Sequence, residues 1–544
     1  MFASLVPRTL AIASLLALLI APAARADEFP LQLPGDASAA SVRAVRDTWM
    51  VGARPGRDSA AIARRFGARH VGAKATGSYV VARAQARALA HALGHRLVYA
   101  QPNVLMKTDA VADDPRSVAP NDWRKVVADP AIDPPQVTPQ SPLIALVDAA
   151  ADTTHPEWTG DPNFTTLPGT PVTNLHGTAT ASVAAAPANG IGILGVWPGA
   201  RALNVPLRTV PGTDGEISCD ASAEAIGKAV DTGAAVINMS YGSVSQCTAE
   251  KIQIYYGVAT GAIPVAAAGN EFQQGNPLEF PASLPHVITV AATDQDGKSA
   301  SFSNANDAVD LSAPGVNILA AVPPSLDDDG TQDGYQLVSG TSFAAPMVSA
   351  AMAWIRQARP DLAPDQAAQA VRLSARDVER KGWDPLTGFG VLDVGAALAI
   401  PKNRLPIHDP LEPNDNLAWV DGRAFGGKPT PAIWSGGRAA RLDALLDKEE
   451  DPVDVYRIVV GAHRSVRISA IPRFGDIELS VFRSSAFSIN DSSGRAARSR
   501  LPGAKKTERV RLSNRGTRAH SYYVEVSPQG SSVYQDRAYS LRVG

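Results

Sequence analysis

The stretch that decides the fold is Leu337-Val338-Ser339-Gly340-Thr341-Ser342-Phe343-Ala344-Ala345-Pro346. An apolar run follows it as far as Ile355 and stops before Pro360, which predicts a buried helix. We expect Pro346 near the start of that helix, where a missing backbone N–H costs least. Ser342 would then lie at a helix N-terminus among free N–H groups, an environment that suits a nucleophilic serine. The alternative is a serine that only caps a core helix.

Short apolar runs precede this helix between residues 141 and 400. Such runs are typical of strands buried on both faces, and helical patterns alternate with them. The predicted strands are 143–148, 202–205, 235–239, 263–268 and 286–291, and the predicted helices are 178–186, 222–232, 248–260 and 343–357. This alternation predicts an α/β domain whose parallel sheet has helices on both faces. In sheets of this kind, functional residues gather at the carboxyl ends of the strands.

The segments on either side differ in character. Residues 27–108 combine short strands with helical patterns, which predicts a small α+β domain, and the acidic and Pro-rich residues 109–140 are typical of a linker. Residues 401–544 carry alternating runs separated by turns, which predicts an all-β sandwich. Nine basic residues lie between Arg495 and Arg518. They favour a solvated loop, with a surface for anionic polymers as the alternative.

The chain begins with a targeting segment, residues 1–26. Arg8 precedes the apolar stretch Leu10–Ala21, and Ala24-Arg25-Ala26 has the small-x-small form of a cleavage site. The apolar stretch is short for a membrane span. We therefore expect cleavage after Ala26 and a secreted or periplasmic protein with no membrane contact afterwards. An uncleaved anchor is the alternative.

Composition sets two further limits. The chain has 544 residues, of which 51 are basic and 53 acidic, and the net charge of −2 gives no sign of a nucleic-acid partner. Its only two cysteines are Cys219 and Cys247. In an exported chain a single disulfide is the simplest assignment, and two buried free thiols are the alternative.

Three short stretches supply the groups that a nucleophilic Ser342 needs. Asp148 ends a predicted buried strand, where a fixed carboxylate would be presented. His176 is followed by Gly177 and other small residues, so it can serve as a base that Asp148 orients. Asn270 ends another strand in Gly-Asn and can donate a hydrogen bond to an oxyanion. Taken singly, each has a structural alternative: an acid that caps a helix, a hydrogen-bonded core histidine or a turn asparagine.

Together these stretches resemble the subtilisin-like serine proteases (subtilases, peptidase S8 family). Residues 146–157 resemble the aspartate block of that family, His176-Gly177-Thr178 with 189–198 its histidine block, and 340–346 its serine signature. The chain departs from the pattern at Ala149-Ala150, where the family has a small residue and glycine, and at Ala179, where it usually has a second histidine. The likeness covers residues 141 to about 398 and keeps the order Asp, His, Ser.

The resemblance implies an exported serine endopeptidase that hydrolyses peptide bonds in proteins through an acyl-enzyme. Ser342 is then the nucleophile, His176 the general acid and base, and Asp148 the group that orients the imidazole. Asn270 and the N–H of Ser342 would bind the oxyanion. The implied substrate-binding residues are Ser240, Tyr241, Gly242, Ala267, Ala268 and Gly269. A catalytically silent subtilase fold used for binding is the alternative.

The resemblance extends to both flanks. The segment around residues 47–107 resembles the inhibitory propeptide of a zymogen, with a permanent accessory domain as the alternative. The junction would lie between Lys107 and Ser141. Residues 409–544 resemble the bacterial pre-peptidase C-terminal domain, through 411–415 and 451–456.

No cofactor is implied for the chemistry. Glu157 and Asn189 fall where some subtilases place ligands of a structural calcium, which leaves calcium as an open alternative for this chain. Two residues are few beside the six or more oxygens that calcium takes.

Overall fold

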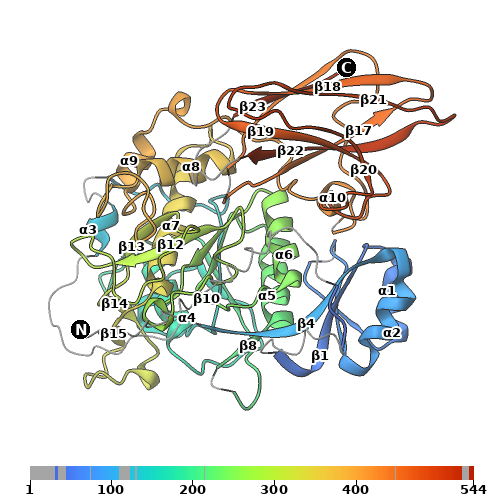
Figure 1. Ribbon diagram of the computed structural model, residues 1–544. Helices are drawn as coiled ribbons and strands as arrows, with labels where there is room; N and C mark the ends of the chain where they lie inside the picture. The colour runs from blue at the N-terminus through green and yellow to red at the C-terminus, as the bar shows by residue number, and fades with distance from the viewer. Residues whose placement is uncertain are drawn as a thin grey trace, which may run out of the picture.

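The computed structural model describes residues 31–34, 44–73, 75–108, 123–128, 132–213, 215–424, 426–447, 449–529 and 538–544 (Figure 1). The predicted targeting segment and most of the predicted linker lie outside the described residues. No described helix combines the length and hydropathy that a membrane crossing requires.

A seven-stranded, fully parallel sheet forms the centre of the molecule, as predicted. Its strands, from one edge to the other, are β13 (Leu311–Pro314), β12 (Ile288–Thr293), β11 (Ile263–Ala267), β9 (Val236–Met239), β5 (Ile144–Asp148), β7 (Ala202–Pro206) and β6 (Phe164–Thr166). Every residue of β12, β11, β9 and β5 is buried, which explains their continuous apolar sequences.

Helices cover both faces of this sheet and complete a three-layer domain. One face carries α4 (His176–Ala185), α7 (Thr341–Ala358), α8 (Pro364–Ser374) and α9 (Val394–Ala399), and the other carries α5 (Cys219–Asp231) and α6 (Thr248–Ala259). Successive side chains of β5 point to opposite faces: Ile144 and Leu146 enter the α7 core, whereas Ala145 and Val147 enter the α5–α6 core. Smaller elements of this part are α3 (Arg124–Val127), β8 (Ile217–Ser218), β10 (Tyr241–Gly242) and the hairpin of β14 (Ile318–Ala321) and β15 (Tyr335–Val338).

The N-terminal domain is a small antiparallel sheet with two helices. It consists of β1 (Ala44–Ala53), α1 (Arg57–Arg65), β2 (Arg69–Val71), β3 (Ser78–Ala82), α2 (Arg83–Leu93) and β4 (Leu97–Thr108). Its two helices cover one face of the sheet. The other face packs on α5 and α6, where Met50 and Tyr99 share a core with Tyr255. In Figure 1, β4 runs out of this domain toward β8 and β10.

The C-terminal part ends in two packed four-stranded antiparallel sheets, as predicted. One contains β16 (Ala440–Ala444), β23 (Tyr539–Val543), β18 (Ser465–Pro472) and β21 (Glu508–Ser513), and the other β17 (Asp454–Val460), β22 (His520–Gln529), β19 (Asp476–Arg483) and β20 (Arg495–Ser499). Before them comes the short helix α10 (Leu417–Val420), whose Trp419 ring lies 5.0 Å from the Tyr255 ring on α6. The chain therefore returns to the central domain before it enters the sandwich.

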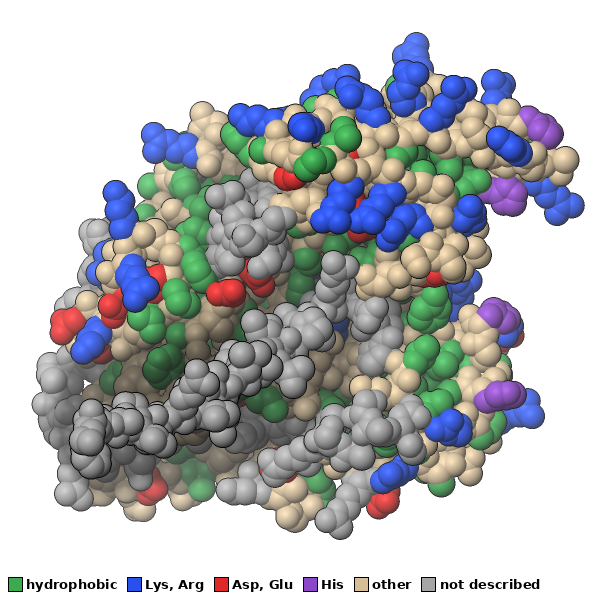
Figure 2. Space-filling view, in the orientation of Figure 1, with side chains coloured by type: hydrophobic (Ala, Val, Ile, Leu, Met, Phe, Trp, Pro, Cys, Tyr) green, Lys and Arg blue, Asp and Glu red, His purple; other side chains and the backbone are tan. Residues whose placement is uncertain are grey.

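The basic stretch between Arg495 and Arg518 is not a single loop, so that expectation is wrong. It contains β20 and the whole of β21: Ala496 and Ala497 of β20 pack against the sandwich core, and alternate residues of β21, among them Val510 and Leu512, are buried in it. The outward residues remain basic, and Figure 2 shows Lys and Arg side chains gathered over the part of the surface where the sandwich lies.

Candidate active site

Asp148 and His176 form a buried hydrogen-bonded pair. Asp148 is the last residue of β5 and His176 the first of α4, and they are 0 % and 3 % exposed. The Nδ1 atom of His176 lies 2.6 Å from Oδ1 of Asp148. The close approach needs glycine at position 177, because a Cβ there would lie 2.0 Å from the carbonyl oxygen of Ala149. The pair can hold one tautomer of the imidazole and stabilise its protonated form.

Two more donors hold the carboxylate of Asp148. The hydroxyl of Thr180 donates to Oδ2 at 3.0 Å, and the backbone N–H of Ala149 donates to Oδ1 at 2.7 Å. The sequence analysis did not single out Thr180. The spacing could have identified it, because Thr180 lies four residues after His176 and therefore on the same face of α4.

Ser342 lies at the start of α7, as predicted, and is the second residue of that helix. Its hydroxyl donates to the backbone oxygen of Ser240 over a long 3.4 Å. The ring of the next residue, Phe343, lies 5.5 Å from the ring of His176. The helix start that carries the serine therefore lies beside the imidazole.

Pro346 lies in the interior of α7, not in its first turn, so that detail of the prediction is wrong. A proline there cannot donate to the carbonyl four residues earlier, which belongs to Ser342. The hydroxyl of Ser240 replaces the missing donor and bonds that carbonyl at 2.9 Å. The helix tolerates Pro346 because β9 ends beside it, and the same contact fixes the backbone of Ser342 against that strand end.

The side chain of Asn270 is oriented by Thr341. Its Oδ1 accepts from the backbone N–H of Thr341 at 2.9 Å and from the Thr341 hydroxyl at 3.0 Å. Its Nδ2 is buried and has no hydrogen-bond partner in the part of the chain that the structure describes. A Cβ built on Gly340, two residues before Ser342, would lie 3.5 Å from that Nδ2. An unpartnered N–H donor thus lies beside the serine loop, where an oxyanion would need it.

The other predicted substrate-binding residues lie next to these groups. Ala267 ends β11, and Ala268 and Gly269 follow it, both alanines being 1 % exposed. The N–H of Gly269 donates to the Thr341 hydroxyl at 3.2 Å. A Cβ at Gly269 would come within 2.3 Å of the Asn304 amide, and its φ of 102° also favours glycine.

Strand β4 of the N-terminal domain lies between β8 and β10. It pairs antiparallel with both: Leu105 and Met106 face Ser218 and Ile217, and Thr108 and Lys107 face Tyr241 and Gly242. Ser240, whose carbonyl accepts the Ser342 hydroxyl, immediately precedes Tyr241. An extended chain is thus held by strand addition along the path that leads to Ser342.

The structure joins Cys219 and Cys247 in a disulfide, as predicted. Cys219 begins α5 and Cys247 is the N-cap residue of α6, so the disulfide links the starts of these two helices.

Glu250 is a buried acidic residue that contacts β10 through Tyr241, and the sequence did not point to it. Glu250 is fully buried on α6, and its Oε1 accepts the hydroxyl of Tyr241 at 2.8 Å. Burial raises the pKa of Glu250 to about 7, although the hydrogen bond from Tyr241 lowers it. Nothing in the spacing distinguished Glu250 from a solvent-facing helical glutamate.

We expect Glu250 to make the chain less stable as the pH rises. Between its unfolded pKa, near 4.5, and about 7, the unfolded chain releases the proton while the folded chain keeps it, so stability falls. Above that range the loss stays constant at about 3 kcal/mol. Glu250→Gln should remove this fall in thermal unfolding measured between pH 5 and 8. Tyr241→Phe, which keeps the carboxyl group, should retain it; an unchanged pH profile in Glu250→Gln would contradict the assignment.

Glu157 and Asn189 lie together but supply few free ligands for calcium. The amide of Asn189 donates to the backbone oxygen of Glu157 at 2.7 Å, and its Oδ1 accepts the N–H of Ile191. Oε2 of Glu157 accepts from the Tyr335 hydroxyl at 2.7 Å, and its Oε1 has no partner within the described ranges. Within the described part of the chain, Glu157 belongs to no group of three or more acidic, histidine or cysteine side chains that could hold a metal ion. These side chains by themselves do not fit a calcium site.

Comparison with known proteins agrees with this geometry. The sequence pattern of the subtilase family matches residues 139–390. Subtilisin BL of Lederbergia lenta is 32 % identical over 257 residues, which are 47 % of this chain and 89 % of that protein. The chain belongs to the subtilase family.

Other relatives of this subtilase are longer than the region that matches. Fervidolysin of Fervidobacterium pennivorans is 35 % identical over 288 residues, which are 48 % of this subtilase but 41 % of fervidolysin. The crystal structure of fervidolysin, described as a keratinolytic enzyme related to subtilisin, aligns with 87 % of this chain and 88 % of its own, with a TM-score of 0.56 and 19 % identity. At that identity the structural likeness concerns the fold alone.

Proposed function

We propose that this subtilase is an exported serine endopeptidase. The observation that carries the proposal is the buried 2.6 Å pair of His176 and Asp148 beside the helix start that bears Ser342. The Oγ of Ser342 attacks the peptide carbonyl and its proton passes to Nε2 of His176, while Asp148 stabilises the imidazolium. The oxyanion accepts hydrogen bonds from Nδ2 of Asn270 and the N–H of Ser342. The leaving amine takes the proton from His176, and water then hydrolyses the acyl-enzyme by the same steps.

A fluorophosphonate probe tests this proposal against a catalytically silent binding fold. The probe reacts with serines that a base has activated, so we expect labelling at Ser342 in the wild-type chain and none in His176→Ala. Peptide mapping by mass spectrometry locates the label. A folded wild-type chain that takes up no probe would favour the silent fold.

We further propose that the N-terminal domain is an inhibitory propeptide. Its strand β4 occupies the path along β8 and β10 that a peptide substrate would take. A chain that continues this register past Thr108 would meet Ser240 one residue later. We therefore expect self-cleavage at the bond between Asp109 and Ala110, which N-terminal sequencing of the secreted protein would identify. A permanent accessory domain would leave this bond intact.

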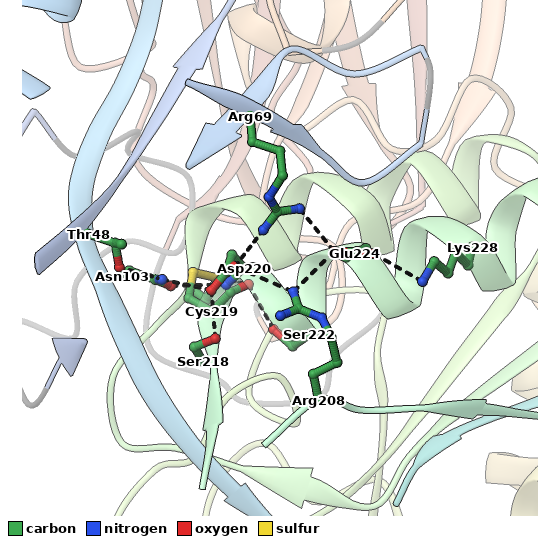
Figure 3. A network of polar contacts seen from close by, with 11 residues as sticks. Thr48, Arg69, Asn103, Arg208, Ser218, Cys219, Asp220, Ser222, Glu224 and Lys228 are labelled. Atoms are coloured by element: carbon green, nitrogen blue, oxygen red, sulfur yellow. Dashed lines mark hydrogen bonds and ion pairs between the residues drawn. A yellow bond between two sulfur atoms is a disulfide. The ribbon is translucent and has the colours of Figure 1, made fainter. Parts of the chain in front are cut away.

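A charged network holds the proposed propeptide on α5. Figure 3 shows Arg69 of β2 between Asp220 and Glu224, at 2.9 and 3.1 Å. Asn103 of β4 also donates to Asp220 at 2.7 Å. Arg208 shares Glu224 at 3.1 Å. The contacts join two strands of the propeptide to the first turns of one helix.

Arg69→Ala should release the propeptide sooner. Arg69 is half exposed, so each of its two ion pairs contributes little, and we expect the lag before activity appears to shorten by about two- to tenfold. The effect should shrink as salt is added. The measurement is the lag in hydrolysis of a fluorogenic peptide. Arg65→Ala, on the helix at the other face of the sheet, is the control; an equal effect there would rule out a role for this network.

The predicted cleavage after Ala26 and export remain part of this proposal. Protein recovered from outside the inner membrane, with residue 27 or a later one at its N-terminus, would support them. Recovery only in the cytoplasm would contradict them.

A further inference from the structure

Four carboxylates gather where the central domain meets the C-terminal sandwich. One oxygen each from Asp409, Glu412, Asp451 and Asp454 lies within 4.8 Å of the others. Among the residues that the structure describes, no Lys or Arg forms an ion pair with any of the four; the imidazole of His286 has its Nε2 3.6 Å from Glu412. Like charges held this close repel one another strongly.

Two members of this cluster are almost wholly buried and present an oxygen without a partner. Asp454 is 0 % exposed; its Oδ2 accepts the Tyr539 hydroxyl at 2.5 Å, and its Oδ1 has no hydrogen-bond partner among the described residues. Asp409 is 6 % exposed; its Oδ2 accepts the N–H of Leu445, and no described residue bonds its Oδ1. Burying unpartnered carboxylate oxygens is unfavourable unless something else binds them.

We propose that Asp409, Glu412, Asp451 and Asp454 bind a calcium ion. Carboxylate oxygen is the donor that calcium prefers, and calcium accepts an irregular set of six to eight such ligands. Zinc and copper favour nitrogen and sulfur, and magnesium demands a near-ideal octahedron. A pocket of about 290 Å³ lies alongside, lined in part by Asp409, Glu412 and Asp451, and it gives the ion a route from solvent.

The position of the cluster gives the ion a structural role. Asp409 and Glu412 precede α10, Asp451 lies just before β17 and Asp454 is its first residue, so the ion would join the end of the central domain to the sandwich. The loop before β12 contacts the same junction through His286. Its ring Nε2 lies 3.0 Å from Asp415, and its backbone N–H donates to the backbone oxygen of Glu450. Loss of calcium should loosen this junction. The inference does not depend on the proteolytic proposal, because none of these residues belongs to the proposed triad.

The first test counts calcium in the full-length chain carrying Ser342→Ala. After treatment with EDTA and dialysis, calcium chloride is titrated in and the bound metal is counted by plasma mass spectrometry. We expect Asp451→Asn to bind one calcium fewer than its parent, or to bind it at least about tenfold more weakly. Glu157→Gln, at the other candidate position, should keep that ion. Equal calcium binding by Asp451→Asn and its parent would overturn the proposal.

Thermal unfolding provides a second test, because Asp451→Asn should change the unfolding temperature differently in calcium and in EDTA. In calcium, Asp451→Asn should unfold at a lower temperature than its parent. In EDTA it should unfold at the same temperature or higher, because one of the repelling charges is gone. The same decrease in both buffers would mean that Asp451 has only a structural role, which overturns the proposal. If Asp451→Asn does not fold, the unfolding temperature of the parent chain is compared in calcium and in EDTA. Identical temperatures in the two buffers would overturn the proposal.

Discussion

Ser342→Ala should abolish peptide hydrolysis and leave the fold intact. Ser342 is the proposed nucleophile, and it lies at the helix start beside the His176–Asp148 pair. We expect kcat to fall by about 10⁶-fold, a magnitude taken from subtilisin and not obtained from this chain. Alanine fits the site because Ser342 is 1 % exposed and its only described side-chain hydrogen bond is the long one to Ser240. Hydrolysis of a fluorogenic peptide and thermal unfolding measure the two effects.

The same variant tests self-cleavage. Its chain should keep the N-terminal domain in one covalent piece, whereas the wild-type chain separates at the predicted junction. Ser349→Ala is the matched control, because Ser349 lies on the same helix and bonds Asn238 at 2.9 Å. That control should lose some stability and keep activity. Substantial hydrolysis by Ser342→Ala would show that another group is the nucleophile.

Asn270→Ala should lower kcat by about 100- to 1000-fold with KM nearly unchanged. The reason is that Nδ2 of Asn270 has no partner among the described residues and becomes a hydrogen-bond donor to the oxyanion, which exists only after attack. The ground-state carbonyl gains little from it. Steady-state kinetics on a fluorogenic peptide separates the two parameters.

A second substitution separates this role from a structural one. Because Oδ1 of Asn270 accepts from the first N–H of α7, alanine also removes a helix cap and costs about 1 kcal/mol of stability. Asn270→Asp keeps that acceptor and removes the donor. We expect it to unfold near the wild-type temperature and yet to be as inactive as Asn270→Ala. Full activity in Asn270→Asp would exclude the oxyanion role.

Much of the fold follows from local pattern. The buried parallel strands appear as continuous apolar runs and the sandwich strands as alternating ones, because burial on two faces or one sets the period of the sequence. Both predictions are confirmed. The predicted loop within Arg495–Arg518 is wrong because charged residues on one face of a strand look like a solvated loop. The place of Pro346 was also wrong, since only the neighbouring hydroxyl of Ser240 makes it tolerable inside a helix.

The sequence by itself determined the proposed catalytic residues, because each chemical group sits in a short stretch whose local structure can be inferred: a strand end at Asp148, a helix start at Ser342. Only the tertiary structure decided which distant groups meet. The hydroxyl of Ser240 reaches a carbonyl 102 residues later, and Arg69 reaches an acid 151 residues away. The carboxylates of Asp409 and Asp454 converge only when the sandwich packs against the central domain. Such contacts depend on sheet register and domain packing, which no local pattern encodes.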